Sequence, residues 1–219
     1  YKDIGDSKRV TELIESIPEE GRKAHPELQE KLIFAYKKMD RLDEAEAIIN
    51  KLKAENKYTN RALLTSLLAS IKKRRASVAD DPDTAHYLRE EAIAYYQESF
   101  DQDPNAFQPG IAMLNLLYLS EHDPGLFTKY FPLVEYSIDR RIKSTKEYWA
   151  LVSRIELEVM KNSPDAIKHV VPALLSVHAP WKREITIKHL ELIRDYKSLK
   201  RIEDQSKINT IIEKFKKGI

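Results

Sequence analysis

The side chains in this sequence that could perform chemistry are histidines and carboxylates, and they do not form a complete site. His86 and Glu90 lie four residues apart, which places them on one face of a predicted helix, as two metal ligands can lie. No second ligand pair accompanies them, so a solvated pair on a helix surface is the favoured interpretation. His178 and His189 stand outside any HExxH-type motif. We therefore expect no catalytic residue, no metal site and no cofactor.

An acidic cluster and the missing reactive motifs support the same expectation. Asp80, Asp81 and Asp83 suggest part of a calcium loop, but the glycine and the terminal glutamate of an EF-hand are absent. We predict a loop before a helix, with Asp83 as the N-cap. The sequence has no cysteine, no serine in a nucleophile elbow and no glycine-rich phosphate loop. The chain is predicted not to be an enzyme.

The densest basic run is KKRR at residues 72–75. Basic residues at the C-terminal end of a helix usually complement its dipole, and no aromatic side chains are interleaved here for stacking on bases. The formal net charge is only +2, which gives no general attraction to nucleic acid. A nucleic-acid-binding helical array that uses residues 72–75 together with Arg140, Arg141 and Lys143 is the alternative hypothesis.

The composition is that of an ordinary globular chain. Charged residues make up 33% of the 219 residues and hydrophobic residues 42%, with only 5 glycines, which argues against multi-turn β folds. No apolar run approaches the roughly 18 residues of a membrane-spanning helix. The absence of cysteine fits a reducing compartment, and we predict a cytoplasmic location. The sequence begins with Tyr1 and shows no signal peptide, so we expect an excerpt from a longer protein.

Apolar residues at helical spacing predict a short helix near the start of the chain. Asp6 is its predicted N-cap and Pro18 ends it. The apolar positions of this helix are Val10, Leu13, Ile14 and Ile17.

The next two predicted helices match one tetratricopeptide unit. The first helix opens at Pro26, where a proline loses no hydrogen bond, and small Ala45 is predicted at the closest crossing with the second. Grooves that clamp a peptide carboxylate in such repeats use Lys, Asn and Arg on the concave face. The corresponding face here carries Glu27, Glu30 and Phe34, which disfavours such a clamp. The matching pattern consists of Leu32, Tyr36, residues 42–45 and Ile49.

Residues 90–118 link one predicted helix pair to the next. Ala92, Tyr96 and Phe100, followed by Pro104, recur at the spacing at which one tetratricopeptide helix pair gives way to its neighbour. The stretch therefore favours a helical repeat array. The preceding pair is predicted as helices near residues 61–75 and 84–101.

Two proline motifs recur 40 residues apart. Asp123 and Ser163 each precede a proline, and each is a predicted N-cap. Pro132 and Pro172 follow eight residues after those prolines. We predict that both lie inside helices and kink them.

These patterns predict an all-α protein, a tetratricopeptide-like right-handed solenoid of stacked antiparallel helix hairpins. Each hairpin is apolar on two sides and is stable only when its neighbours cover it. The last helices are predicted near residues 181–199 and 204–217. We predict a single domain over residues 1–219, with a tetratricopeptide-like unit at 1–60, further repeats at 61–199 and a capping helix at 200–219.

Several motifs occur in a particular order between residues 63 and 196. They are Ala92, Tyr96, Phe100 and Pro104, then Gly110-Ile111, Tyr148-Trp149 and Pro180-Trp181. In this order they resemble the TRAFs-binding region of apoptosis-signal-regulating MAP kinase kinase kinases and its bacterial relatives. That region is rich in tetratricopeptide repeats and regulatory, so the resemblance implies a scaffold rather than phosphoryl transfer. Trp149 and Trp181 are interpreted as aromatic plugs between helices.

The sequence thus predicts a non-catalytic protein–protein interaction and regulatory scaffold module, part of a larger signalling or defence protein. Its expected partner is another protein or an adjacent effector domain, without a membrane or a cofactor. The oligomeric state is left open. The residues predicted to contact the partner are Lys37, Lys38, Lys72, Arg75, Asn115 and Tyr118.

Overall fold

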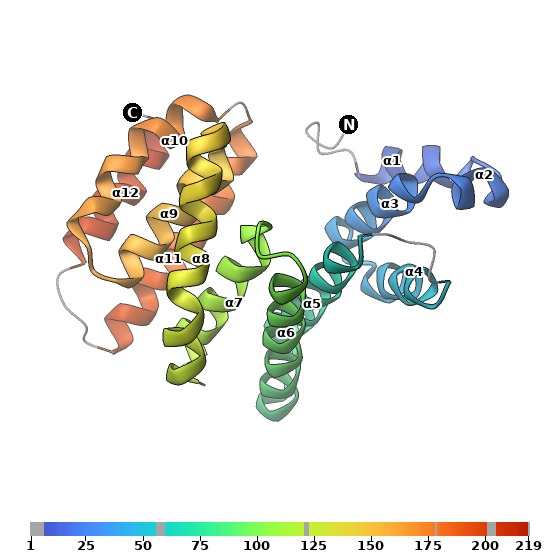
Figure 1. The fold of residues 1–219 in the computed structure, drawn as a ribbon, viewed down its shortest axis with the longest axis horizontal. Helices are drawn as coiled ribbons and strands as arrows, with labels where there is room; N and C mark the ends of the chain where they lie inside the picture. The colour runs from blue at the N-terminus through green and yellow to red at the C-terminus, as the bar shows by residue number, and fades with distance from the viewer. Residues whose placement is uncertain (1–6, 56–59, 121–122, 178, 201–204, 219) are drawn as a thin grey trace. The chain divides into compact units, whose positions relative to one another are not determined.

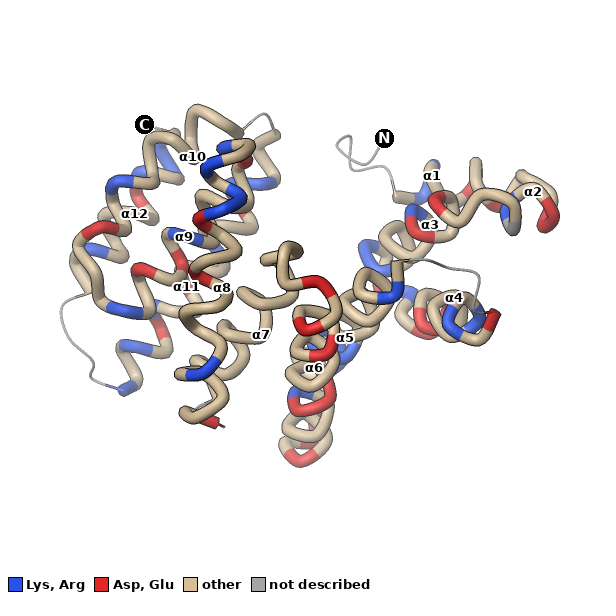
Figure 2. The backbone as a smooth tube through the Cα atoms, viewed as in Figure 1, with Lys and Arg blue, Asp and Glu red and all other residues tan. Residues whose placement is uncertain are grey.

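The computed structural model describes residues 7–55, 60–120, 123–177, 179–200 and 205–218. Within these ranges the regular secondary structure is entirely helical. The chain divides into two compact units, Tyr1–Asp103 (unit 1) and Pro104–Ile219 (unit 2). Figure 1 gives their helices, and Figure 2 shows that acidic and basic residues are interspersed along both units.

Unit 1 is built from antiparallel helix hairpins. Helices α3 and α4 pack as one hairpin and α5 and α6 as another, while α1 packs against α3 and α4 against α5. This arrangement confirms the predicted all-α, tetratricopeptide-like fold class. The helices are α1 (Ser7–Glu15), α2 (Glu19–Ala24), α3 (Pro26–Lys38), α4 (Leu42–Ala54), α5 (Arg61–Val78) and α6 (Pro82–Gln102).

The core of unit 1 lies where α3, α4 and α5 meet. Ala45 on α4 is completely buried there, as predicted for the closest helix crossing, because a larger side chain would separate the helices. Ala92 on α6 is also fully buried. The buried side chains of this core include Leu32, Ile33, Tyr36, Ile49, Leu64, Leu67, Leu68 and Ile71.

Two short turns join the helices of these hairpins. Asp40 adopts a left-handed conformation (φ 62°), and the Arg41 amide donates to the Tyr36 carbonyl at 2.9 Å, which closes the turn between α3 and α4. Between α5 and α6 the N-cap is Asp81, whose carboxylate accepts from the Thr84 amide at 2.8 Å. The prediction of Asp83 as the cap is wrong, because Pro82 occupies the first helical position and starts α6 two residues earlier than expected.

Unit 2 combines two long hairpin helices with shorter segments. Helix α8 packs on α7 and α9, α9 contacts η1, α10 and α11, and α12 packs on α11. Buried Ile208, Ile211 and Phe215 attach α12 to this unit. The elements are α7 (Phe107–Ser120), α8 (Pro124–Thr145), α9 (Tyr148–Met160), the 3₁₀ helix η1 (Pro164–His169), α10 (Val170–Ser176), α11 (Pro180–Leu199) and α12 (Ser206–Lys217).

The two proline motifs of unit 2 both provide an N-cap, but the helices that follow them differ. Asp123 and Ser163 are the N-caps predicted, accepting from the amides of Leu126 at 2.8 Å and Asp165 at 3.1 Å. Pro132 lies inside α8 and Pro172 inside α10.

The segment after Ser163 differs from the continuous helix that its motif suggests. Residues Pro164–His169 form η1, and α-helix follows only from Val170 to Ser176. Pro172 lies in the first turn of α10, directly after the 3₁₀ helix, whereas Pro132 lies within the continuous helix α8. An internal proline alone therefore does not account for the 3₁₀ segment.

The structure does not test two predicted helix starts or the predicted division into domains. The predicted cap Asp6 and the predicted helix start at Asp204 lie outside the described residues. The single domain over residues 1–219 and its three subdivisions stay predictions. The boundary between the two compact units follows Asp103, inside the predicted repeats at 61–199.

An ion-pair cluster joins α8 to α9 in unit 2. The Arg154 guanidinium lies 2.8 Å from Glu135, 3.3 Å from Asp139 and 2.7 Å from Glu158. The Lys161 ammonium also contacts Glu135, at 2.6 Å. One guanidinium therefore balances carboxylates from two helices.

The carboxyl of Glu135 makes this cluster sensitive to acid. Partial burial raises its pKa, but Lys161 and Arg154 outweigh burial and hold the pKa below 4.5. A depressed carboxyl pKa stabilises the fold above the pKa of the unfolded chain, and this stabilisation disappears as pH falls through the folded-state pKa. The free energy of unfolding should therefore be lower in Glu135→Gln than in the wild type at pH 7, and this difference should shrink below pH 4.5. Urea unfolding at both pH values measures it. Glu184→Gln, at an exposed position, is the control, and a difference that stays constant with pH would contradict the assignment.

Candidate functional site

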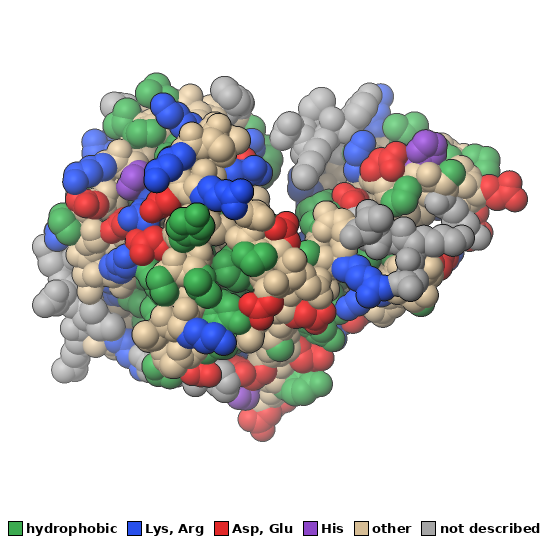
Figure 3. Space-filling model, in the orientation of Figure 1, with side chains coloured by type: hydrophobic (Ala, Val, Ile, Leu, Met, Phe, Trp, Pro, Cys, Tyr) green, Lys and Arg blue, Asp and Glu red, His purple; other side chains and the backbone are tan. Residues whose placement is uncertain are grey.

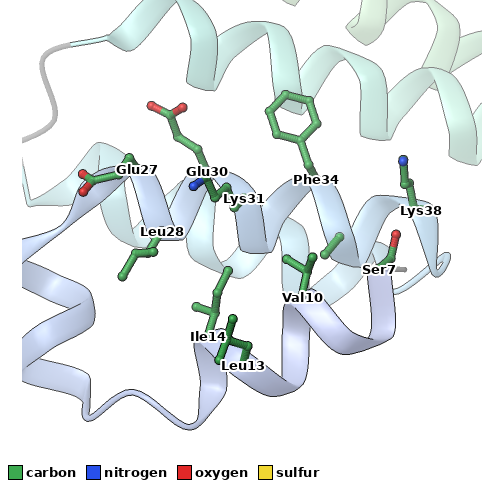
Figure 4. A pocket seen from close by; sticks show the side chains of 11 residues that line it. Ser7, Val10, Leu13, Ile14, Glu27, Leu28, Glu30, Lys31, Phe34 and Lys38 are labelled. Atoms are coloured by element: carbon green, nitrogen blue, oxygen red, sulfur yellow. The ribbon is translucent and has the colours of Figure 1, made fainter. Parts of the chain in front are cut away.

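A groove of about 430 Å³ lies between α1 and α3 in unit 1. Its lining is mainly apolar, and charged side chains stand at its rim (Figure 4). A volume of this size is within the range of protein binding pockets, about 300–1,000 Å³. The apolar lining residues are Val10, Leu13, Ile14, Leu28, Phe34 and Ala35, and the polar ones are Ser7, Glu27, Glu30, Lys31 and Lys38.

The apolar surface of the groove follows from the pattern of α1. Leu13 and Ile14 are neighbours in sequence, so their side chains leave the helix about 100° apart. Ile14 is buried in the core against α3, with 3% of its surface exposed, whereas Leu13 is 59% exposed. One contact with α3 cannot cover both side chains. An aliphatic side chain therefore remains at the surface beside the groove.

The charges along α3 give the rim a direction. Glu27 and Glu30 lie toward the N-terminal end of the helix, and Lys38 lies at its C-terminal end (Figure 4). A hydrogen bond from its own backbone amide and one from His25, at 3.0 Å, hold the pKa of Glu27 below its ordinary value. Lys31, beside Glu30, offsets part of this negative charge. The rim therefore has a net negative charge toward the N-terminal end of α3 and a positive charge at the other end.

The groove lining offers apolar and charged contacts. Among the described residues, no group of three or more histidines, cysteines, aspartates and glutamates could hold a metal ion.

The acidic loop before α6, which suggested calcium, has another role. The Asp81 carboxylate accepts hydrogen bonds from Thr84, and these hold the pKa of Asp81 below its ordinary value.

One of the six predicted partner-binding residues lines this groove, and a second lies next to one of its lining residues. Lys38 lines it, and the Lys37 ammonium lies 5.5 Å from the centre of the Phe34 ring, a cation–π distance. The residues that the prediction missed are the apolar ones from α1, Val10 and Leu13. Their helical spacing in the sequence predicts a helix, but it does not indicate which of its apolar side chains stay exposed.

Lys72 and Arg75 lie elsewhere in unit 1 and connect helices. The Lys72 ammonium is 3.4 Å from Glu46 on α4 and 3.3 Å from Glu91 on α6. Burial alone would lower its pKa, but these two carboxylates raise it above its ordinary value. Arg75 contacts Glu46 and also Asp43, at 2.6 Å.

Other basic side chains named in the nucleic-acid hypothesis also have partners inside their own unit. Arg74 lies 3.0 Å from Asp40 in unit 1. In unit 2, Arg140 bonds Asn105, and Arg141 lies 3.1 Å from Glu147. Carboxylates thus offset the charges of Arg74 and Arg141, whereas the partner of Arg140 is a neutral amide. The nucleic-acid hypothesis stays a prediction.

Asn115 and Tyr118 belong to the packing of unit 2. The Asn115 amide donates to Glu156 at 2.8 Å, and the other oxygen of this buried carboxylate lies 3.1 Å from Nδ1 of His189. The Tyr118 ring packs edge-on against Tyr196, with 5.2 Å between ring centres, and burial raises the pKa of its hydroxyl. The six predicted residues thus occupy several places instead of one site.

The family of this chain is consistent with the hairpins of unit 1. The Tetratricopeptide Repeats-Sensor family matches residues 6–120, which include both helices that form the groove. The chain belongs to this family. Its name describes tetratricopeptide-type repeats, which generally serve as non-catalytic interaction or sensing modules. No curated protein matches the chain.

None of the helices in the described ranges has the length and hydrophobicity needed to cross a membrane. Even α7, which is rich in apolar residues, has only 14 residues.

Proposed function

We propose that this chain is a non-catalytic protein-interaction and regulatory module, and that the α1–α3 groove holds a segment of a protein partner. The observation that carries this proposal is the apolar groove of about 430 Å³ with the half-exposed Leu13 at its side. Burying such apolar surface is the main source of affinity in protein recognition.

The lining defines the chemistry of the partner segment. Aliphatic or aromatic side chains of the segment fill the space between Val10, Leu28 and Phe34. A basic residue at one end of the segment faces Glu27 and Glu30, and an acidic residue at the other end faces Lys38. Complementary charges of this kind fix the direction and register of a bound peptide.

The regulatory part of the proposal rests on two likenesses. The family description contains the word sensor, and the ordered motifs of residues 63–196 resemble the TRAFs-binding region of a group of signalling kinases. Both support a segment that connects a signal to an effector domain, either in the same polypeptide or in a partner protein. We place this activity in the cytoplasm, as part of a larger signalling or defence protein.

A peptide-display selection against the full chain tests the groove. Selected peptides should carry apolar anchors between a basic and an acidic residue. Leu13→Asp should weaken their binding at least about tenfold, because it puts a charge beside the apolar contact. Leu175→Asp, at a 79% exposed position in unit 2, is the matched control and should leave binding unchanged. Peptides that bind both variants as well as the wild type would contradict the proposal.

A further inference from the structure

Helix α11 in unit 2 exposes a row of aliphatic side chains on one face. Ile185 is 36% exposed, Leu192 57% and Leu199 84%. They follow each other at seven-residue intervals, which is close to two helical turns, so they form one stripe. The opposite face of α11 is buried in unit 2 through Thr186, Leu190, Ile193 and Lys197.

Charged residues flank this stripe in a regular way. Lys188 and Asp195 are both exposed and also lie seven residues apart. Lys188 lies four residues before Leu192, and Asp195 lies three residues after it. At about 100° per residue, both positions are rotated to the same side of Leu192, so the two charges lie on one flank of the stripe. The stripe therefore carries one positive and one negative charge beside its central leucine.

This pattern is complementary to itself under a twofold axis at Leu192. In an antiparallel pair of helices, the axis brings Ile185 of each helix opposite Leu199 of the other. The same axis brings Lys188 of each helix to the level of Asp195 of the other helix, on the same flank of the stripe. Two pairs of opposite charge therefore form. An isologous interface requires such matching of one surface with its own copy.

We propose that two copies of this chain associate through antiparallel packing of α11. The contact is distinct from the α1–α3 groove and lies entirely in unit 2. A second copy of the chain is thus a further partner, in addition to the protein proposed to bind the groove. The exposed Asp195 contacts its neighbour Arg194 at 2.7 Å within one chain. Arg194 is half-buried, but the two residues are sequence neighbours and the Asp195 carboxylate faces solvent. An ion pair with one solvent-exposed partner contributes little, so exchanging Arg194 for Lys188 of a second copy costs little.

A second exposed apolar surface of unit 2, over α8, lacks this self-complementarity. The face of unit 2 seen in Figure 3 has hydrophobic side chains over α8, with Lys and Arg nearby. Leu133 and Tyr136 are the exposed apolar residues of that helix, and Lys129, Arg140 and Lys143 are exposed on it too. Two copies meeting there would bring like charges together.

The size of the contact sets the expected affinity. A single pair of 20-residue helices buries less than the roughly 800 Å² per partner of standard interfaces. We therefore expect a reversible dimer with a dissociation constant of about 10⁻⁶–10⁻⁴ M.

Sedimentation equilibrium of the full 219-residue chain over this concentration range tests the proposal. The wild type should show a monomer–dimer equilibrium. Leu192→Glu should weaken it at least about tenfold, and Leu175→Glu on α10 should not. Circular dichroism checks that each variant keeps its helical content.

Charge-reversal variants then test whether Lys188 and Asp195 pair across the dimer contact. Lys188→Glu alone places a second carboxylate opposite Asp195, and Asp195→Lys alone places a second ammonium opposite Lys188, so each variant should dimerise at least about tenfold more weakly. An equimolar mixture of the two variants matches both pairs again and should recover dimerisation to within about threefold of the wild type. A wild type that stays monomeric throughout, or a mixture that dimerises no better than its components, overturns the proposal. Neither result would affect the peptide-binding test of the groove.

Discussion

Replacing Phe100 by alanine should lower the free energy of unfolding by about 3–5 kcal/mol, the usual cost of truncating a buried phenylalanine. The Phe100 side chain is 2% exposed near the end of α6. Next to it, the Ser99 hydroxyl donates to the Ala62 carbonyl at 2.7 Å, which fixes this part of α6 against α5. The surroundings therefore cannot collapse freely into the space that the ring would leave.

Urea unfolding followed by circular dichroism measures this loss. Tyr87→Ala is the matched control, because Tyr87 is an aromatic residue of the same helix but is 62% exposed. Its replacement should change the free energy of unfolding little. Equal effects of the two substitutions would contradict the burial of Phe100 and the packing of the α5–α6 hairpin.

Arg154→Met should destabilise unit 2 by about 3–4 kcal/mol, because it leaves carboxylates without their cation in a largely dry place. The Arg154 side chain is 17% exposed, and that of its partner Glu158 only 6%. The cost comes mainly from the stranded charge of Glu158, since Glu135 still has Lys161 at 2.6 Å. Loss of packing alone would be a smaller effect, because methionine fills similar space.

A double variant separates these two causes. Arg154→Met combined with Glu158→Leu removes the buried charge together with its partner and should return the stability to within about 1 kcal/mol of the wild type. Lys168→Met, which removes an exposed cation of the same unit, should have little effect. A double variant that is no more stable than Arg154→Met would show that the stranded carboxylate is not the cause.

Local signals predicted much of the fold. The N-caps Asp123 and Ser163 and the first-turn Pro26 were correct because capping and proline geometry depend on a few neighbouring residues. Helix α2, Glu19–Ala24, was missed because six residues without apolar periodicity give no helical pattern. The 3₁₀ helix before Pro172 was missed because the 40-residue recurrence suggested the geometry of α8.

The candidate site was less predictable than the fold, because its features depend on contacts between distant segments. Glu27, Glu30 and Phe34, which the sequence predicts on one face of their helix, all line the groove. That α1 forms the other side, with Leu13 left half-exposed, depends on how α1 packs on α3 and is not visible in its spacing. Similarly, the partners of Lys72 lie on α4 and α6, far from it in the sequence.

Amide hydrogen–deuterium exchange of the full chain, with and without a selected peptide, tests the groove most directly. Peptide binding should slow exchange in residues 10–15 of α1 and 28–38 of α3, because these segments line the groove. Exchange in α8 should stay unchanged, and the Leu13→Asp variant should show no peptide-dependent protection. Protection confined to helices other than α1 and α3 would contradict protein binding at this groove.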